Sequence, residues 1–239
     1  MNMQKLSRSL LSLLFSGLVL LPLAPAQAVT FKAKGSPQKT AGGATRGVCQ
    51  HLGTSSPQPI LTALIPTTEK ELTVADYPTV LVKISEPGTQ KAELTLWDGE
   101  GNGIYQTIVD LTATPGITSF KIPKAAGALA VGQQYKWNLA LICDPAERQR
   151  DIVLEGRLER VELSSTLNHL LETSSPLEKA KLYAQNGLWY DTVATLADLK
   201  RSLPQNSQIG AEWHELLQSV GLTELSQVPV VDCCQQPKN

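Results

Sequence analysis

The sequence lacks several features that would place it in a familiar functional class. It has three histidines, 5% aromatic residues and no excess of Lys and Arg over Asp and Glu. Duplex nucleic acids are bound through clustered basic surfaces, so a nucleic-acid-binding role is excluded. The sequence also has neither a Gly-x-Ser-x-Gly nucleophile elbow nor a phosphate-binding loop. We therefore predict no catalytic residue, no metal site and no cofactor.

A long apolar run occurs only near the N-terminus, where it has the order of a secretory signal. Lys5 and Arg8 precede the apolar run 10–21, which leads to the small residue Ala28. The run is shorter than the roughly 20 apolar residues that span a bilayer, and no later segment supplies them. Residues 1–28 are therefore predicted to be a cleavable signal peptide. The mature chain is predicted to be periplasmic or extracellular, with no transmembrane segment.

The mature chain divides into four segments by composition and period. Residues 29–46 have no acidic residue and no apolar period, which predicts a flexible linker or, through its basic side chains, a contact with an anionic surface. Residues 47–163 have the pattern of a β-sandwich domain and 164–226 that of a helical hairpin region. Residues 227–239 are polar and are predicted to be a disordered tail.

Short apolar or alternating stretches separated by turn residues predict about seven strands in the first domain. The clearest are 79–84, 104–111, 117–122 and 135–141, the last with an apolar residue at every second position. This pattern predicts an immunoglobulin-like antiparallel β-sandwich.

The spacing of Leu129, Gly132, Tyr135 and Trp137 matches the tyrosine corner of immunoglobulin-like domains. The Tyr135 hydroxyl is then expected to bond to the backbone just upstream. An aromatic ligand site on Tyr135 and Trp137 is the alternative, but alternating aromatics on a strand are more often core.

Four short helices are predicted after residue 163, where the apolar period becomes helical. The segment 175–178 has the sequence of a capping box with Pro at the first helical position. Five residues match the small residue, aromatic, glycine, packing residue and proline of the tetratricopeptide repeat: Ala180, Tyr183, Gly187, Leu196 and Pro204. The region is predicted to be one tetratricopeptide-like repeat with a solvating helix.

Trp189, Tyr190 and Trp213 concentrate aromatic side chains in this helical region. Such residues are enriched at interface hot spots and equally common between two domains of one chain. Two hypotheses follow: contact with an envelope protein partner, or intramolecular packing against the sandwich.

The four cysteines suggest one long-range bridge. An exported chain is in an oxidising compartment, so Cys49 and Cys143 are predicted to form a disulfide. A metal site on Cys49, His51 and Cys143 is the rival hypothesis, although the spacing is not a recognised zinc pattern. The adjacent Cys233 and Cys234 are predicted not to bridge each other, and to be disordered or to pair between molecules.

Asp98, Glu100 and Asn102 are spaced like the first half of a calcium loop. The twelfth position, which should be a bidentate Glu, is Val109, so the site is a weak candidate. A Gly-rich hairpin turn is the preferred interpretation, and we predict no tight calcium binding.

Several sequence blocks resemble an exported cyanobacterial family known as domain of unknown function 928. They are 46–49, 61–66, 77–79, 142–145 and 187–191. The resemblance implies a cyanobacterial periplasmic or secreted protein, and it implies no activity.

The sequence thus predicts a non-catalytic binding or scaffold module of the cell envelope. One alternative is an envelope hydrolase with a carboxylate site, for which Asp144, Glu147 and Asp151 share a polar loop. Another is a calcium- or glycan-binding, lectin-like domain.

Overall fold

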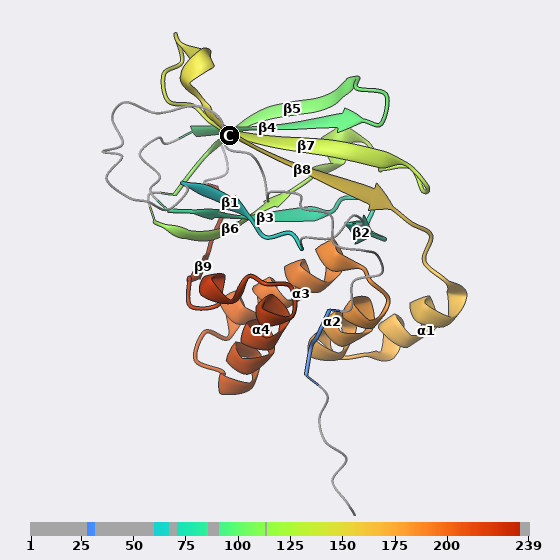
Figure 1. The fold of residues 1–239 in the computed structure, drawn as a ribbon. Coiled ribbons are helices and arrows are strands. Elements are labelled where there is room, and N and C mark those ends of the chain that lie inside the picture. The colour runs from blue at the N-terminus through green and yellow to red at the C-terminus, as the bar shows by residue number, and fades with distance from the viewer. Residues whose placement is uncertain (1–27, 32–59, 67–70, 86–90, 113, 235–239) are drawn as a thin grey trace, which may run out of the picture.

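The computed structural model describes residues 28–31, 60–66, 71–85, 91–112 and 114–234. Within these residues the chain forms two β-sheets and four α-helices (Figure 1). The two sheets lie one above the other, and the helices lie below the smaller sheet. We call the face of the larger sheet that is turned away from the helices the free face.

The larger sheet has five strands in the order β2-β8-β7-β4-β5. Their bounds are β2 Leu72–Thr73, β4 Lys91–Asp98, β5 Gly103–Asp110, β7 Gln134–Leu141 and β8 Ile152–Arg160. All neighbours pair antiparallel except β2 and β8, which are parallel. The strand β5 is one edge of this sheet, so its outer side chains border the free face.

The smaller sheet has the order β1-β3-β6-β9. Its strands are β1 Leu61–Ala63, β3 Thr79–Ile84, β6 Gly116–Lys121 and β9 Val230–Val231. The last strand pairs parallel with β6, through Ile117 and Val230. The two sheets enclose a core because every second residue of β4, β7 and β8 is apolar and points inward. The predicted combination of two mostly antiparallel sheets followed by helices is confirmed.

The helices are α1 Ser165–Thr173, α2 Pro176–Gln185, α3 Trp189–Ser202 and α4 Ser207–Ser219. The predicted capping box is confirmed: the Ser175 hydroxyl accepts from the Glu178 backbone, and the Glu178 carboxylate accepts from the Ser175 backbone. Gly187 follows α2 with φ of 75°, a left-handed value that glycine adopts freely, and it turns the chain into α3. Among the helices described, none is both long and apolar enough to cross a bilayer.

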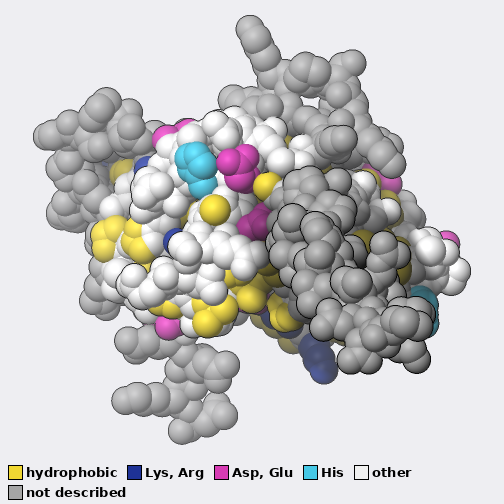
Figure 2. Space-filling view, turned by 90° about the horizontal axis from the view of Figure 1, so that it is seen from below, with side chains coloured by type: hydrophobic (Ala, Val, Ile, Leu, Met, Phe, Trp, Pro, Cys, Tyr) yellow, Lys and Arg dark blue, Asp and Glu magenta, His cyan; other side chains and the backbone are white. Residues whose placement is uncertain are grey.

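The aromatic side chains of the helical region point into the molecule. Trp189 and Trp213 have no exposed surface and Tyr190 has 1%. The Trp189 indole donates a hydrogen bond of 2.8 Å to the Leu64 carbonyl of the sandwich. Of the two hypotheses for these residues, their burial agrees with intramolecular packing of the helices against the sheets, and it leaves none of the three side chains exposed for contact with a partner. On the helical side seen in Figure 2, hydrophobic side chains are interspersed with polar and charged ones.

A buried polar network joins α3 to the larger sheet. The Trp137 indole donates to the Tyr190 hydroxyl oxygen at 2.9 Å. The single proton of that hydroxyl faces two acceptors, a Glu71 carboxylate oxygen at 2.9 Å and the Arg157 carbonyl oxygen at 2.5 Å. Burial raises the pKa of Glu71 from 4.5 to about 7, although the hydrogen bond from Tyr190 opposes the shift. Satisfied networks of this kind fix one arrangement of their parts.

The raised pKa of Glu71 makes the fold sensitive to pH. A carboxyl whose pKa is raised by folding stabilises the fold below its unfolded pKa, and this contribution is lost as pH rises through the folded pKa. We expect the free energy of unfolding to fall between pH 4.5 and about 7. Glu71→Gln cannot ionise and keeps an acceptor for Tyr190, so it should lose on the order of 2 kcal/mol less over this range. Urea unfolding at pH 5 and pH 8 measures the difference, and equal losses in both proteins would contradict it.

The predicted tyrosine corner is present at the start of β7. The Ala130 backbone N–H donates to the Tyr135 hydroxyl oxygen at 2.8 Å. Tyr135 is 8% exposed and Trp137 is fully buried, so both belong to the core as expected. The alternative of an aromatic ligand site on these two residues is not supported.

Two segments predicted to be unstructured are ordered where the structure describes them. Val29 and Phe31, at the start of the predicted linker, are buried against the helices. The segment predicted to be a disordered tail contains the strand β9, because Val230 and Val231 pair with β6. Segments of two to four residues are too short to show a periodic pattern of apolar residues, so the sequence does not reveal them.

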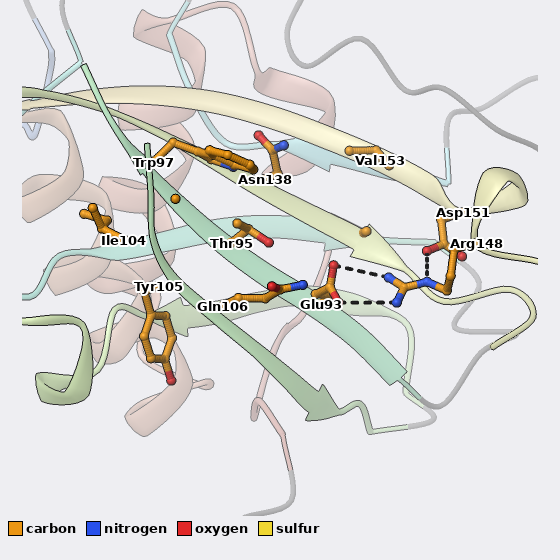
Figure 3. Close-up of a pocket in the computed structure, with 12 residues that line it drawn as sticks. Glu93, Thr95, Trp97, Ile104, Tyr105, Gln106, Asn138, Arg148, Asp151 and Val153 are labelled. Carbon is orange, nitrogen blue, oxygen red and sulfur yellow. Dashed lines mark hydrogen bonds and ion pairs between the residues drawn. The ribbon is translucent and has the colours of Figure 1, made fainter. Parts of the chain in front are cut away.

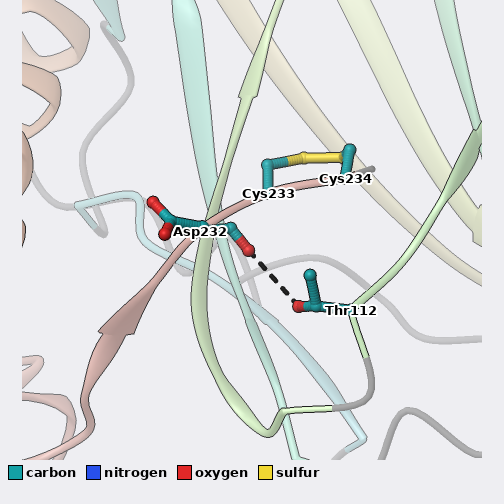
Figure 4. Close-up of a disulfide and its surroundings, with 4 residues drawn as sticks. All are labelled: Thr112, Asp232, Cys233 and Cys234. Carbon is teal, nitrogen blue, oxygen red and sulfur yellow. Dashed lines mark hydrogen bonds between the residues drawn. A yellow bond between two sulfur atoms is a disulfide. The ribbon is translucent and has the colours of Figure 1, made fainter. Parts of the chain in front are cut away.

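The adjacent Cys233 and Cys234 follow β9 and are bonded to each other (Figure 4). The prediction that they are disordered or pair between molecules is therefore wrong. Cys234 takes a left-handed backbone, with φ of 44°. The preceding Asp232 is held to the sandwich, since its carbonyl accepts from the Thr112 hydroxyl at 3.3 Å. Both cysteines pack against the core beside β5 and β6.

Candidate functional site

The strands β4, β5, β7 and β8 present one set of side chains to the core and the other set to the free face of the larger sheet. In β4, Leu94 and Leu96 are buried, while Glu93, Thr95 and Trp97 alternate with them and point outward. The register places Asn138 of β7 and Gln106 of β5 on either side of Thr95. The free face thus has a row of hydrogen-bonding side chains at its centre.

Trp97 is half-buried on this face and lies flat beside Asn138 (Figure 3). The ammonium group of Lys136 lies 5.7 Å from the centre of the indole ring, a cation–π contact. Gly103 faces Trp97 across the strand pair, and a Cβ atom there would lie 3.5 Å from the ring. Because Gly103 has no side chain, it adds no such contact to the Trp97 ring.

The other end of the face is closed by a cluster of charges around Arg148. Its guanidinium forms two hydrogen-bonded contacts to Glu93, of 3.2 and 3.3 Å, and one of 2.6 Å to Asp151 (Figure 3). Asp151 also accepts from the Cys143 backbone at 3.1 Å. Hydrogen bonds to Asp151 and Glu93 raise the pKa of Arg148 above its usual range. The cluster therefore ties the loop before β8 to Glu93 of β4, at this end of the strands.

Between Trp97 and Arg148 the face is hollowed into an open groove of about 670 Å³. Twelve residues of the larger sheet and the loop before β8 line it, among them Thr95, Gln106 and Asn138. A groove of this size accommodates a ligand of one or a few rings. One aromatic face surrounded by amide, hydroxyl and charged groups can stack on an apolar ring face and bond to hydroxyl groups.

Two polar atoms on the floor of this groove have no hydrogen-bond partner among the described residues. They are the Trp97 indole nitrogen and the Asn138 amide oxygen. Buried polar groups are nearly always paired in folded proteins, so exceptions point to strain or to a missing partner. A ligand hydroxyl could supply that partner after a small side-chain rotation.

The weak calcium-loop candidate is a hydrogen-bonded turn between β4 and β5. The Asp98 carboxylate accepts from the backbone of Glu100 at 3.0 Å and of Asn102 at 2.8 Å, and from the Asn102 amide at 2.9 Å. These bonds, led by the Asn102 side chain, lower the pKa of Asp98. The carboxylate is thus committed to the turn, which agrees with the hairpin interpretation.

The loop carboxylates considered for a hydrolase are separately engaged. Asp151 is paired with Arg148, Glu147 pairs with Arg150 at 2.6 Å, and Asp144 accepts from the Ala146 backbone at 2.8 Å. Each therefore has a structural role. Among the described residues there is also no group of three or more His, Cys, Asp or Glu side chains that could hold a metal ion.

Cys143 lies just after β7, in the loop that leads to Arg148. Cys49 and His51 lie outside the described residues. The Cys49–Cys143 disulfide, with the rival metal site, therefore stays a prediction.

Sequence reasoning did not single out Trp97 or the groove. The signal was present in the sequence. Trp97 falls at the positions that alternate with Leu94 and Leu96, and these positions otherwise hold polar residues. A tryptophan at such a position is exposed on a sheet face and needs a reason to be there. The pairing of Glu93 with Arg148, which are 55 residues apart, requires the fold.

Comparisons with known proteins identify the family and little else. No curated protein matches the chain in sequence. Among solved structures, the fn3 domain of the human collagen alpha-1(XX) chain is similar over 52% of this chain and 93% of that chain, with 15% identity and a TM-score of 0.27. The family model of Domain of Unknown Function DUF928 matches residues 41–230, which is most of the sequence. The chain therefore belongs to the DUF928 family.

Proposed function

We propose that this protein is a non-catalytic binding module that holds a neutral oligosaccharide in the groove of its larger sheet. The observation that carries the proposal is the half-buried Trp97 on the free face, surrounded by Thr95, Asn138 and Gln106. Sugars combine apolar ring faces with hydroxyl groups, and this set of side chains offers a partner for each.

The charged cluster supports binding rather than hydrolysis. Glu93 and Asp151 are both bonded to Arg148, so neither is a free general acid or base. The guanidinium N–H groups of Arg148 that are not used in these contacts can donate to a sugar hydroxyl. The cluster would then set the end of the groove and orient the ligand.

The helices act in this proposal as support for the sheets. The helices α2 and α3 contact each other, and α2 has the small buried residues Ala180 and Ala184, which favours one tetratricopeptide-like unit. The immunoglobulin-like character of the sheets rests likewise on the tyrosine corner at Tyr135. With the signal-like N-terminus, we place the protein in the cell envelope or outside it.

Trp97→Ala is expected to weaken oligosaccharide binding at least about tenfold, the effect of losing roughly 1.4 kcal/mol of stacking. Isothermal titration of the mature chain with cello-, malto- and chito-oligosaccharides measures it. Leu170→Ala, on the exposed side of α1, is the matched control and should leave binding unchanged. Failure of every sugar in this panel to bind, or equal binding by Trp97→Ala, would contradict the proposal.

A further inference from the structure

The segment Ala28–Phe31 enters the helical region in an extended in-and-out pattern. Ala28 and Thr30 are exposed, whereas Val29 and Phe31 are 1% and 5% exposed. The Phe31 ring meets the Trp189 ring edge to face, with centroids 5.1 Å apart. In Figure 1 this short blue segment runs beside α2 and α4. The side chains of Val29 and Phe31 therefore belong to the core, while the exposed Ala28 lies directly before the first of them.

Two side chains of α4 hold the backbone of this segment. The Val29 nitrogen donates to a Glu212 carboxylate oxygen at 2.5 Å, and the Phe31 nitrogen donates to the Ser219 hydroxyl at 3.0 Å. Glu212 is 6% exposed, and its other carboxylate oxygen lies 2.9 Å from the Lys181 ammonium. One oxygen of a buried carboxylate is thus reserved for the nitrogen of Val29.

The same bond is the one predicted to be cut. Signal peptides end in small residues such as Ala28, so a signal peptidase is expected to hydrolyse the bond between Ala28 and Val29. Water adds across the amide: the Ala28 carbonyl leaves as a carboxylate, and the Val29 nitrogen becomes an ammonium group. A neutral donor to Glu212 is thereby replaced by a cation at the same place.

We propose that the Glu212 side chain is a binding site for the processed N-terminus, and that cleavage after Ala28 creates its ligand, the Val29 α-ammonium group. An ammonium on a carboxylate forms a stronger hydrogen bond than a neutral amide does. Because Ala28 is exposed, its removal leaves the remaining protons of the ammonium group open to water. The fold is then most stable only after processing. The inference rests on the predicted cleavage site and is independent of the sugar-binding groove.

The test compares two forms of the mature chain that differ by one residue. One starts at Val29 and the other at Ala28, and both are released from a fusion by a protease that leaves no added residue. The form starting at Val29 should melt higher by about 3 °C at pH 7. The difference should vanish in Glu212→Gln versions of both forms. It should also shrink above pH 9, because an α-amino group is then deprotonated. Equal melting temperatures, or a difference that persists in Glu212→Gln, would overturn the proposal.

A second measurement tests the cleavage separately. The full chain is expressed in a bacterium with an export pathway, and the intact mass of the exported protein is determined. The expected mass corresponds to a chain that starts at Val29. A start at any other residue would overturn the proposal, whatever the melting data show.

Discussion

Trp213→Ala is expected to lower the free energy of unfolding by about 3–5 kcal/mol. The side chain has no exposed surface, and its indole nitrogen has no hydrogen-bond partner among the described residues. The loss is therefore one of packing in the core between α4 and its neighbours, where Leu216 and Leu217 are also fully buried. Urea unfolding of the mature chain measures the effect.

Two further variants make this result interpretable. Trp213→Phe keeps most of the buried volume, so it should stay folded and lose less than Trp213→Ala. Trp97→Ala, at the half-buried tryptophan on the sheet face, should change stability far less. If Trp213→Ala were as stable as the parent, the conclusion that the helical aromatics are structural would be wrong.

Gly156→Ala is expected to destabilise the protein by about 3 kcal/mol. Gly156 lies on the inner face of β8, opposite Trp137 of β7. A Cβ atom at this position would lie 2.3 Å from the Trp137 ring. The ring cannot move aside easily, because it is fully buried and bonded to the Tyr190 hydroxyl. The added methyl group should therefore also disturb the network that joins α3 to the sheet.

Gly103→Ala is the matched control for this prediction. It lies in the same sheet, and its added Cβ would make an ordinary contact of 3.5 Å with Trp97. Thermal unfolding should show a large fall for Gly156→Ala and a small change for Gly103→Ala. Similar losses of stability at the two positions would contradict the prediction, because the close approach of Gly156 to Trp137 would then not explain the effect of Gly156→Ala.

Local sequence patterns predicted the parts of the fold that depend on local physics. The strand expected at 79–84 has those bounds, because alternation and flanking turn residues define it. The capping box at Ser175 and the Tyr135 corner were recognisable for the same reason: each needs only residues a few positions apart. Such signals survive in a single sequence.

Features that depend on distant residues could not be predicted in this way. The two-residue strand β9 exists only because β6 offers it an edge. Val29 is held in its buried position by a hydrogen bond from its backbone nitrogen to the carboxylate of Glu212, 183 residues later. The sequence shows which residues of β4 alternate with its apolar ones, but whether helices cover that face of the sheet is decided by tertiary packing. The groove at Trp97 therefore became visible only with the fold.

Binding of an oligosaccharide on the free face at Trp97 is tested most directly by the indole signals of the protein. The chain has four tryptophans, of which Trp137, Trp189 and Trp213 are fully buried. In nitrogen-15 labelled mature protein, titration with the oligosaccharide that binds best should shift the Trp97 indole signal, identified by its loss in Trp97→Phe, and leave the other three in place. An unchanged Trp97 signal at saturating sugar, or shifts confined to the buried tryptophans, would contradict the account.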